Sequence, residues 1–436
     1  MDFDNVVETQ LSAAQPRDVL NARHVTPAAY AEQLLREESG IFANTSFEPQ
    51  TIRCVGVIGA GLMAGQLAIL FARRLRVPVL ITDVSQARID HCLAWIATHL
   101  DKLQDRGHLN EATAAELRAL FRGTLDRKDF GSCDVVIEAV IEDLAVKRTV
   151  LSEIEKFVST EALLLTNTSS LSLASMGEQL AHRKRLIGMH FFNPVAVLPL
   201  VEVIRTAEND APTLARVGDL ARLLGKTPVL VEDAPGFVVN RILTRLFSEL
   251  LRLIDAGFDI KTVDHALDPL DLPMTPLTLL GFIGPAVQRH ICESMHAAYP
   301  GRFGVSPGLV AAAEAGLSGF LDASGELLPE AKALLQPSNV DSASMTTDAA
   351  GIGALVLEAL AEEVGLILAE KVVASPKEID LCMILGANFP KRHGGLTPLL
   401  DLSGASRKVW GKNLHESHGF AEEAASSVGS TQAVST

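Results

Sequence analysis

Cysteines are few and isolated in this chain of 436 residues. The five, Cys54, Cys92, Cys133, Cys292 and Cys382, include no CxxC pair. Secreted disulfide proteins and zinc sites need paired or regularly spaced cysteines, so this spacing argues against both. We therefore expect reduced thiols that act as small buried hydrophobic residues, in a reducing compartment such as the cytoplasm.

Long apolar runs are also missing. The first ten residues, MDFDNVVETQ, are acidic and lack the apolar centre of a signal peptide. No run of about 18 uncharged apolar residues follows, although a membrane-spanning helix needs one. The sequence thus predicts neither export nor membrane insertion.

Basic residues are outnumbered, since 38 Lys and Arg stand against 53 Asp and Glu and the net charge is −15 at pH 7. Nucleic-acid binding needs clustered Lys and Arg that release counterions, so we expect no nucleic-acid partner. The net charge does not exclude a local basic pocket that binds a small phosphorylated ligand. With 48% apolar and 21% charged residues the chain has the balance of a globular protein, and its length suggests about three domains.

Between residues 51 and 233, short β-branched runs alternate with helical stretches. The runs are VGVIG, VPVLITD, DVVIEAV, ALLLTNT, LIGMHF, LVEVI and TPVLVED. This alternation predicts an α/β Rossmann-type domain with a doubly wound, largely parallel sheet. Helical spacing within residues 85–121, around a polar turn, predicts a helical hairpin inserted over the sheet edge. Residues 1–50 are polar and mixed, and we interpret them as an N-terminal extension with one helix that starts near Ala28.

From residue 234 onward the strand pattern disappears, and FVVNRILTRLFSELLRLIDAG predicts a long, largely buried helix. Two later segments, around Asp264 and Asp380, share the order helix, loop, hydrophobic residue with Asp, then proline. This similarity predicts two tandem all-α domains, residues 234–336 and 337–412, joined through the Ala-, Gly-, Ser- and Pro-rich stretch 311–345. The tail, residues 413–436, is poor in apolar residues and is expected to be disordered.

A glycine pattern follows the first predicted strand. In CVGVIGAGLMAGQ, the residues Gly59, Gly61 and Ala64 have GxGxxA spacing between an apolar strand and an apolar helix, which is the context that this motif requires. Gly59 permits a tight turn, Gly61 lets the backbone approach a pyrophosphate, and the small side chain of Ala64 lets the helix pack on the strand.

The second predicted strand ends at Asp83. A carboxylate there accepts both ribose hydroxyls of NAD and repels the 2′-phosphate of NADP, so the sequence predicts NAD as the cofactor. In the alternative interpretation Asp83 only caps the next helix. The predicted cofactor site thus comprises Gly59, Gly61, Leu62, Met63, Ala64 and Asp83.

Two acid/base candidates lie downstream, in GMHFFNP and LVEVI. Oxidation of a hydroxyl to a ketone needs a base for the alcohol proton while hydride leaves the same carbon. His190 exchanges protons near neutral pH, and Glu202 would hold one ring nitrogen and stabilise the imidazolium. On spacing alone, His190 also fits an ordinary strand-end residue and Glu202 a solvated one. The pattern by itself does not establish the pair.

Taken together, GAGLMA, VIEAV, NTSSL, HFFNPV, LVEVI and DAPGFVVNR occur in the order and approximate spacing of the 3-hydroxyacyl-CoA dehydrogenases. Residues 52–300 resemble this family closely. The resemblance implies that His190 is the acid/base and that Glu202 orients it. It also implies that Ser169 and Asn240 help to place substrate and nicotinamide. A turn residue at 169 and an inward polar group at 240 are the alternatives.

The resemblance implies further cofactor contacts. A Glu and a Lys after the VIEAV strand correspond to Glu142 and Lys147, and Asn193 lies in HFFNP. In the alternative interpretation residues 142 and 147 lie on the surface of a helix. We also expect the inserted hairpin to face the CoA moiety, with Lys102 or Arg106 meeting its phosphates, although a charged helix end is normally just solvated.

The sequence departs from the family pattern inside the glycine motif. GLMAGQ replaces the usual GLMGxG, so that Ala64 stands in place of a glycine and Gln66 stands where another glycine is common. Ala is small enough to keep the helix close to the strand. We therefore expect this departure to leave the chemistry unchanged.

The activity that the resemblance implies is NAD-dependent oxidation of L-3-hydroxyacyl-CoA to 3-ketoacyl-CoA, and the reverse reaction. In multifunctional fatty-acid oxidation enzymes two tandem helical domains follow the NAD domain, and an enoyl-CoA hydratase domain precedes it. Only about fifty residues precede it here, too few for a hydratase fold, so we expect a separate hydratase or thiolase subunit as a partner. The resemblance is also compatible with a homodimer. The alternatives are a dehydrogenase of another 3-hydroxy acid and a non-catalytic subunit of a β-oxidation assembly.

Overall fold

The computed structural model describes residues 26–37, 42, 51–322, 324–335 and 348–415, and these form two compact units. Of these described residues, 42 and 51–234 belong to the first unit, and the rest, including the helix α2 (Pro27–Arg36), belong to the second. Apart from residues 413–415, the tail that the sequence predicts to be disordered lies outside the described residues.

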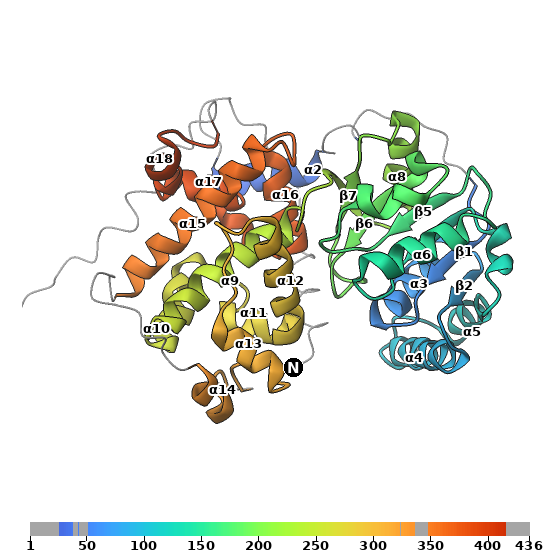
Figure 1. Ribbon diagram of the computed structural model, residues 1–436, viewed down its shortest axis with the longest axis horizontal. Coiled ribbons are helices and arrows are strands. Elements are labelled where there is room, and N and C mark those ends of the chain that lie inside the picture. The colour runs from blue at the N-terminus through green and yellow to red at the C-terminus, as the bar shows by residue number, and fades with distance from the viewer. Residues whose placement is uncertain (1–25, 38–41, 43–50, 323, 336–347, 416–436) are drawn as a thin grey trace, which may run out of the picture. The chain divides into compact units, whose positions relative to one another are not determined.

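One eight-stranded sheet carries the first unit (Figure 1). Its strand order is β3-β2-β1-β4-β5-β6-β7-β8. All neighbours run parallel except β6 and β7, which are antiparallel. The strands are β1 (Val55–Ile58), β2 (Val79–Thr82), β3 (Phe121–Gly123), β4 (Val135–Glu138), β5 (Leu163–Thr166), β6 (Leu186–Phe191), β7 (Leu200–Arg205) and β8 (Thr227–Glu232). The predicted Rossmann-type fold is thereby confirmed.

The seven predicted runs all form strands, whereas β3 was not predicted. Its three residues, Phe-Arg-Gly, are too few to show a strand pattern in the sequence. They pair with β2 at the edge of the sheet. The strand β3 forms because the helical hairpin inserted after β2 returns the chain to the edge of the sheet beside β2.

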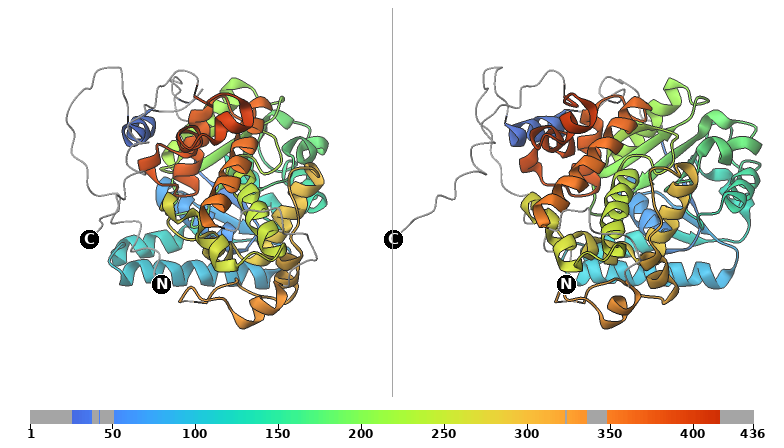
Figure 2. Two further views of the ribbon diagram at one scale, coloured as in Figure 1. Left: turned by 90° about the vertical axis from the view of Figure 1, so that its left-hand side faces the viewer. Right: turned by 60° about the vertical axis from the view of Figure 1, so that its left-hand side comes forward.

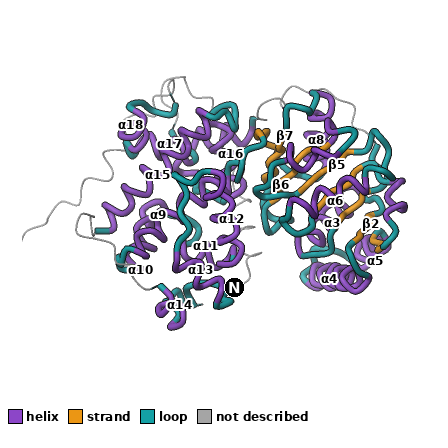
Figure 3. The backbone as a smooth tube through the Cα atoms, viewed as in Figure 1, coloured by secondary structure: helices purple, strands orange, loops and turns teal. Residues whose placement is uncertain are grey.

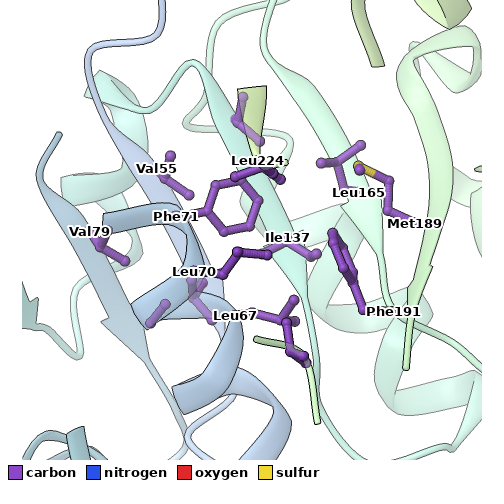
Figure 4. Packing of buried hydrophobic residues seen from close by; sticks show 14 of the residues in the cluster. Val55, Leu67, Leu70, Phe71, Val79, Ile137, Leu165, Met189, Phe191 and Leu224 are labelled. Atoms are coloured by element: carbon purple, nitrogen blue, oxygen red, sulfur yellow. The ribbon is translucent and has the colours of Figure 1, made fainter. Parts of the chain in front are cut away.

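Helices cover the sheet and bury its apolar runs. The covering helices include α3 (Leu62–Leu75), α6 (Leu144–Ile154), α7 (Leu173–Met176) and α8 (Ala211–Leu223). In Figure 4, Leu67 and Phe71 of α3 lie among Val55, Ile137 and Leu165 of β1, β4 and β5, and all five belong to one buried cluster. Strands buried on both faces read as continuous Val, Ile and Leu runs, which is why these segments were recognisable. Each such buried side chain contributes about 1.5–3 kcal/mol.

Two helices, α4 (Gln86–Asp105) and α5 (Glu111–Ala119), occupy the span of the predicted hairpin and pack against β3. Ser85 and Asn110 begin them, because each side chain accepts a hydrogen bond from a backbone amide in the first turn. Gly65 lets α3 approach α4 closely, since a Cβ there would lie 2.9 Å from the ring of Trp95.

The second unit is helical, and Figure 3 shows that the strands of the described chain lie in the first unit. Its long helices α9 (Val239–Asp255) and α15 (Ala349–Ala369) pack against each other. Arg241 of α9 is completely buried and forms ion pairs with Glu363 of α15 and with Glu370, the residue that follows α15. The remaining helices are α10 (Ile260–Asp264), α11 (Pro276–Ile283), α12 (Pro285–Ala298), α13 (Pro307–Glu314), α14 (Pro329–Leu334), α16 (Pro376–Gly386), α17 (Leu396–Leu402) and α18 (Ala405–Trp410).

The two segments predicted to be repeats use their aspartates in the same way. Asp264 ends α10 and accepts a hydrogen bond from the amide of Leu277 in the first turn of α11, at 2.7 Å. Asp380 of α16 accepts one from the amide of Thr397 in the first turn of α17, at 2.8 Å. Both aspartates are buried. This correspondence supports the duplication, but the copies pack into one compact unit, and α14 forms within the predicted linker.

The helix α2 lies in the stretch that we interpret as an N-terminal extension, yet it belongs to the helical unit. It packs beside α16 and the 3₁₀ turn Lys391–His393 (Figure 2). The Tyr30 hydroxyl donates to Asp380 Oδ2 at 3.1 Å. The helix therefore covers the second copy of the repeat, while residues 1–25, 38–41 and 43–50 lie outside the described chain.

All five cysteines are buried and unbridged, as the sequence predicts. None of the helices in the described ranges combines the length and the apolar composition that a membrane-spanning segment requires.

Candidate active site

The glycine turn after β1 has the geometry of a dinucleotide-binding turn. Gly59 has φ +113°, and a Cβ there would lie 2.4 Å from the carbonyl oxygen of Ala139, so only glycine fits. Its amide donates to the carbonyl of Thr82 at 2.8 Å, which ties the turn to β2. A Cβ added at Gly61 would meet no described atom within 4 Å. The start of α3 therefore faces open space that a pyrophosphate can enter.

The three residues that follow begin α3. Ala64 is completely buried, as expected of a residue that lets the helix pack on the sheet. Met63 is half-buried and Leu62 is 55% exposed at the open side of the turn. The structure thus places Leu62 and Met63 beside the space next to Gly61.

Asp83 lies immediately after β2, beside the glycine turn. Its Oδ2 accepts from the amide of Ala60, and its Oδ1 accepts from the amide of Val84, both at 2.7 Å. Ser85, not Asp83, caps α4, so the interpretation of Asp83 as the helix cap is wrong. The sequence did not predict Arg88, whose Nε lies 2.9 Å from Asp83 Oδ1. This cation offsets the charge that would repel the 2′-phosphate of NADP.

His190 and Glu202 face each other across β6 and β7. Because the two strands are antiparallel, these residues are register partners and their side chains share one face. His190 Nδ1 lies 2.7 Å from Glu202 Oε2. Glu202 is completely buried, His190 is 6% exposed, and the ring of Phe192 lies 4.5 Å from the imidazole. The arrangement is that of a general base held by a carboxylate.

Glu142 ties together the loops that follow β4 and β5. Its Oε1 accepts hydrogen bonds from Thr168 Oγ1 at 2.6 Å, from the Ser169 amide at 2.7 Å and from Ser169 Oγ at 3.1 Å. Burial raises the pKa of Glu142, but Lys147 and these hydrogen bonds outweigh it and hold the pKa below its usual value. The ionised carboxylate therefore orients Ser169.

Lys147 is 1% exposed, so the interpretation of this residue as part of a helix surface is wrong. Its Nζ lies 2.8 and 2.9 Å from the two carboxylate oxygens of Glu138 and 3.2 Å from Glu142 Oε2. Glu138, at the end of β4, also accepts from Thr166 Oγ1 at 2.6 Å. The role of Glu138 was not predicted, although a charged residue inside the apolar run VIEAV was a usable signal.

Asn193 follows β6 and contacts the glycine-turn helix through Gln66. Gln66 Nε2 donates to Asn193 Oδ1 at 3.0 Å, and Gln66 Oε1 accepts from the amide of Val195 at 2.8 Å. The amide of Phe191 donates to Asn167 Oδ1 at 3.0 Å, so β6 is also tied to the loop after β5. The structural role of Gln66 was not predicted.

The carboxyl ends of parallel strands meet at one edge of a sheet, and the glycine turn, Asp83, Glu142, Ser169 and His190 therefore gather there. Groups from β2, β1, β4, β5 and β6, which are neighbours in the sheet, thus lie along one edge. No cluster of metal-ligating side chains occurs within the part of the chain that the structure describes.

Of the other predicted residues, Lys102 and Arg106 lie away from this group, and Asn240 belongs to the other unit. Lys102 and Arg106 are exposed near the carboxyl end of α4, and at 1.5 Å per residue the helix carries Arg106 about 27 Å along its axis from Arg88. Asn240 is half-buried at the start of α9, in the other unit. The expected contacts of all three with substrate stay predictions.

Family models match both units. Residues 54–234 match the model described as 3-hydroxyacyl-CoA dehydrogenase, NAD binding domain, and residues 236–321 match the C-terminal domain of the same family. The fatty acid oxidation complex subunit alpha of Psychrobacter arcticus is 33% identical over 365 residues, which cover 80% of this chain and 50% of that protein. The chain spans about half the length of the curated relatives that it matches.

Solved structures give a similar result. The (S)-3-hydroxybutyryl-CoA dehydrogenase PaaH1 from Ralstonia eutropha is 32% identical, with a TM-score of 0.57, over 61% of this chain and 94% of that one. The 3-hydroxybutyryl-CoA dehydrogenase from Escherichia coli is 22% identical, with a TM-score of 0.68, over 84% of this chain and 96% of that one. The second similarity shows a shared fold that extends into the later helices.

Proposed function

Because the chain belongs to the 3-hydroxyacyl-CoA dehydrogenase family, we propose that it oxidises L-3-hydroxyacyl-CoA to 3-ketoacyl-CoA with NAD⁺ and catalyses the reverse reduction. The observation that carries this proposal is the buried His190–Glu202 pair, at the same sheet edge as the glycine turn. A base for the alcohol and a site for the hydride acceptor are the two parts that such an oxidation needs.

The residues at the sheet edge fit NAD. Open space beside Gly61 and the first turn of α3 suit the pyrophosphate, and Asp83 lies where the adenosine ribose belongs in this fold. When bound, NAD⁺ supplies the acceptor for the hydride that leaves C3 of the substrate. Lys147 and Asn193 are proposed as further contacts on the family's pattern.

His190 would act as the base through Nε2. Glu202 accepts the hydrogen bond at Nδ1, so the neutral ring carries its proton there and presents the lone pair of Nε2 to the alcohol. Once the ring takes the alcohol proton, the Glu202 carboxylate stabilises the resulting imidazolium. In the reverse direction the same nitrogen returns the proton to the ketone oxygen.

Ser169 would position the substrate oxygen. Its hydroxyl lies 3.1 Å from Glu142 Oε1 and, when rotated away from that carboxylate, would donate to the substrate oxygen, whose own proton faces His190. Asn240 is proposed as a second substrate contact on the family's pattern alone. Lys102 and Arg106 stay candidates for the CoA phosphates.

The relatives named as subunits of a fatty acid oxidation complex support partner subunits for this chain. We propose that a hydratase or thiolase subunit acts with it in β-oxidation, in the cytoplasm. To test the proposed partnership, the chain is purified through an affinity tag, the size of the purified complex is measured, and hydratase and thiolase activities are assayed. A homodimer without either activity would argue against it.

The activity is tested by following NADH absorbance with acetoacetyl-CoA and with free acetoacetate. We expect turnover of the thioester only, and loss of at least about 10² in rate for His190→Gln with NADH binding retained, since acid/base catalysis contributes about 10²–10⁴. His91→Gln, at an exposed position of α4, is the matched control. Preference for free acetoacetate would identify another 3-hydroxy acid as substrate, and no turnover would indicate a non-catalytic subunit.

A further inference from the structure

Gln66 uses both ends of its side-chain amide on the loop that follows β6. The residue lies in the second turn of α3, half-buried, where a glycine could make neither bond. Its Nε2 contacts Asn193 Oδ1 at 3.0 Å, and its Oε1 contacts the amide nitrogen of Val195 at 2.8 Å. A single side chain therefore joins the glycine-turn helix to the loop that carries Asn193.

The polarity of these bonds follows from the backbone. The amide of Val195 can only donate, so the Gln66 atom facing it must be the oxygen Oε1. The other end of Gln66 is then the NH₂ group, a donor, and Asn193 must present its oxygen Oδ1 to it. The NH₂ group of Asn193 is consequently directed away from Gln66, which makes the outward side of Asn193 a hydrogen-bond donor.

The loop does not depend on Gln66 alone. Val195 is buried, and its carbonyl oxygen accepts a hydrogen bond from Lys226 Nζ at 2.5 Å. Lys226 also donates to the carbonyl of Leu198 at 2.6 Å. The backbone of Val195 is thus held on its carbonyl side by Lys226 and on its amide side by Gln66. Loss of the Gln66 bonds should free the Asn193 side chain without unfolding the loop.

Asn193 lies between two functional features of the sheet edge. The glycine turn ends one helical turn before Gln66, and His190 precedes Asn193 by three residues. A ligand group between the pyrophosphate and the reacting carbon in this fold is the ribose or the carboxamide of the nicotinamide half, and both carry oxygen acceptors.

We propose that Gln66 is a positioning residue that orients Asn193 so that its NH₂ group donates to an oxygen of the nicotinamide half of the cofactor. The proposal rests on the NAD-dependent function proposed above. Gln66 does not itself touch the reacting atoms. It acts by selecting which end of the Asn193 amide faces the cofactor.

The test uses Gln66→Glu, which keeps the side chain's shape. The new carboxylate still accepts from the Val195 amide but cannot donate to Asn193 Oδ1, so the Asn193 amide reverses and turns its oxygen toward the cofactor. Loss of the donor should raise the Kd for NADH, measured by calorimetry on the full chain, by about 10-fold. The KM for NADH should rise by a similar factor, with little change in kcat.

A double-variant cycle separates positioning from charge. In an Asn193→Ala background, Gln66→Glu should change the Kd for NADH less than twofold, because the residue through which it acts is gone. Gln104→Glu, near the far end of α4, adds the same charge elsewhere and should leave the Kd unchanged. Melting temperatures within a few degrees of the parent protein would exclude general unfolding.

Three outcomes would overturn the proposal: an unchanged Kd for Gln66→Glu, an equal effect with and without Asn193, or no binding of NADH by the parent chain. The calorimetric Kd does not depend on acyl-CoA turnover. If the parent chain binds NADH but does not reduce acetoacetyl-CoA, the proposed activity is wrong while the role of Gln66 is still decided.

Discussion

Replacing Glu202 with glutamine removes one negative charge from the buried pair and keeps the size of the side chain. Glu202 is completely buried, and its Oε2 lies 2.7 Å from His190 Nδ1. The charge matters most when His190 holds the alcohol proton, because the imidazolium then faces a carboxylate in a dry environment. A hydrogen bond to a charged group contributes about 1.5–3 kcal/mol. We therefore expect kcat/KM to fall by about 10- to 150-fold.

The assay is the initial rate of NADH oxidation with acetoacetyl-CoA, together with NADH binding and thermal unfolding for each variant. Glu232→Gln is the matched control, because Glu232 ends the neighbouring strand β8 and its ion pair with Arg205 is partly exposed. Exposed pairs of this kind contribute at most about 1 kcal/mol to stability, and this one lies outside the site. Equal losses for the two variants, or a loss for Glu202→Gln below about threefold, would refute the reasoning.

Four further substitutions test other parts of the structure. Asp83→Ala should weaken NADH binding more than NADPH binding. Arg88→Gln should strengthen discrimination against NADPH, because it leaves the Asp83 carboxylate without its ion-pair partner. The ratio of the KM for NADPH to the KM for NADH measures this preference, and a ratio that moves the same way in both variants would contradict the prediction. The pKa of Glu142 lies below its ordinary 4.5 in the folded chain, so its ionised form contributes stability that is present above about pH 4.5 and is lost as the pH falls through the lowered pKa. The difference in the free energy of urea unfolding between the parent and Glu142→Gln should therefore shrink on acidification. A constant difference between about pH 3 and pH 7 would argue against this. Arg241→Met leaves Glu363 buried without its main partner and should destabilise the helical unit by about 3–5 kcal/mol in thermal unfolding; a loss below about 1 kcal/mol would mean that the pair is dispensable.

Local features were readable in the sequence because neighbouring residues determine them. The turn at Gly59 needs a positive φ and close approach of the backbone, and GxGxxA between an apolar strand and helix reports both needs. The seven predicted strands are rich in Val, Ile and Leu because helices cover both faces of the sheet. The similarity around Asp264 and Asp380 was visible because each aspartate accepts a hydrogen bond from a backbone amide in the first turn of the next α-helix.

Pairings between distant segments required the tertiary structure. His190 and Glu202 form a pair because β7 reverses direction beside β6, and nothing in either segment reports that reversal. The resemblance to a known family supplied the two residues, but their contact depends on strand order. Likewise, Lys147 looks like a residue on a helix surface until its burial against Glu138 is seen.

The sequence by itself determined the nucleotide turn, every strand of the sheet except β3, and the family, since all three depend on residue order over short spans. The tertiary structure alone decided that Arg88 pairs with Asp83 and that Gln66 reaches Asn193. It also decided that α2 and both helical copies form one unit. Such contacts depend on how helices and strands are brought together in space. The spacing of two residues along the chain does not directly encode the distance between them in the fold.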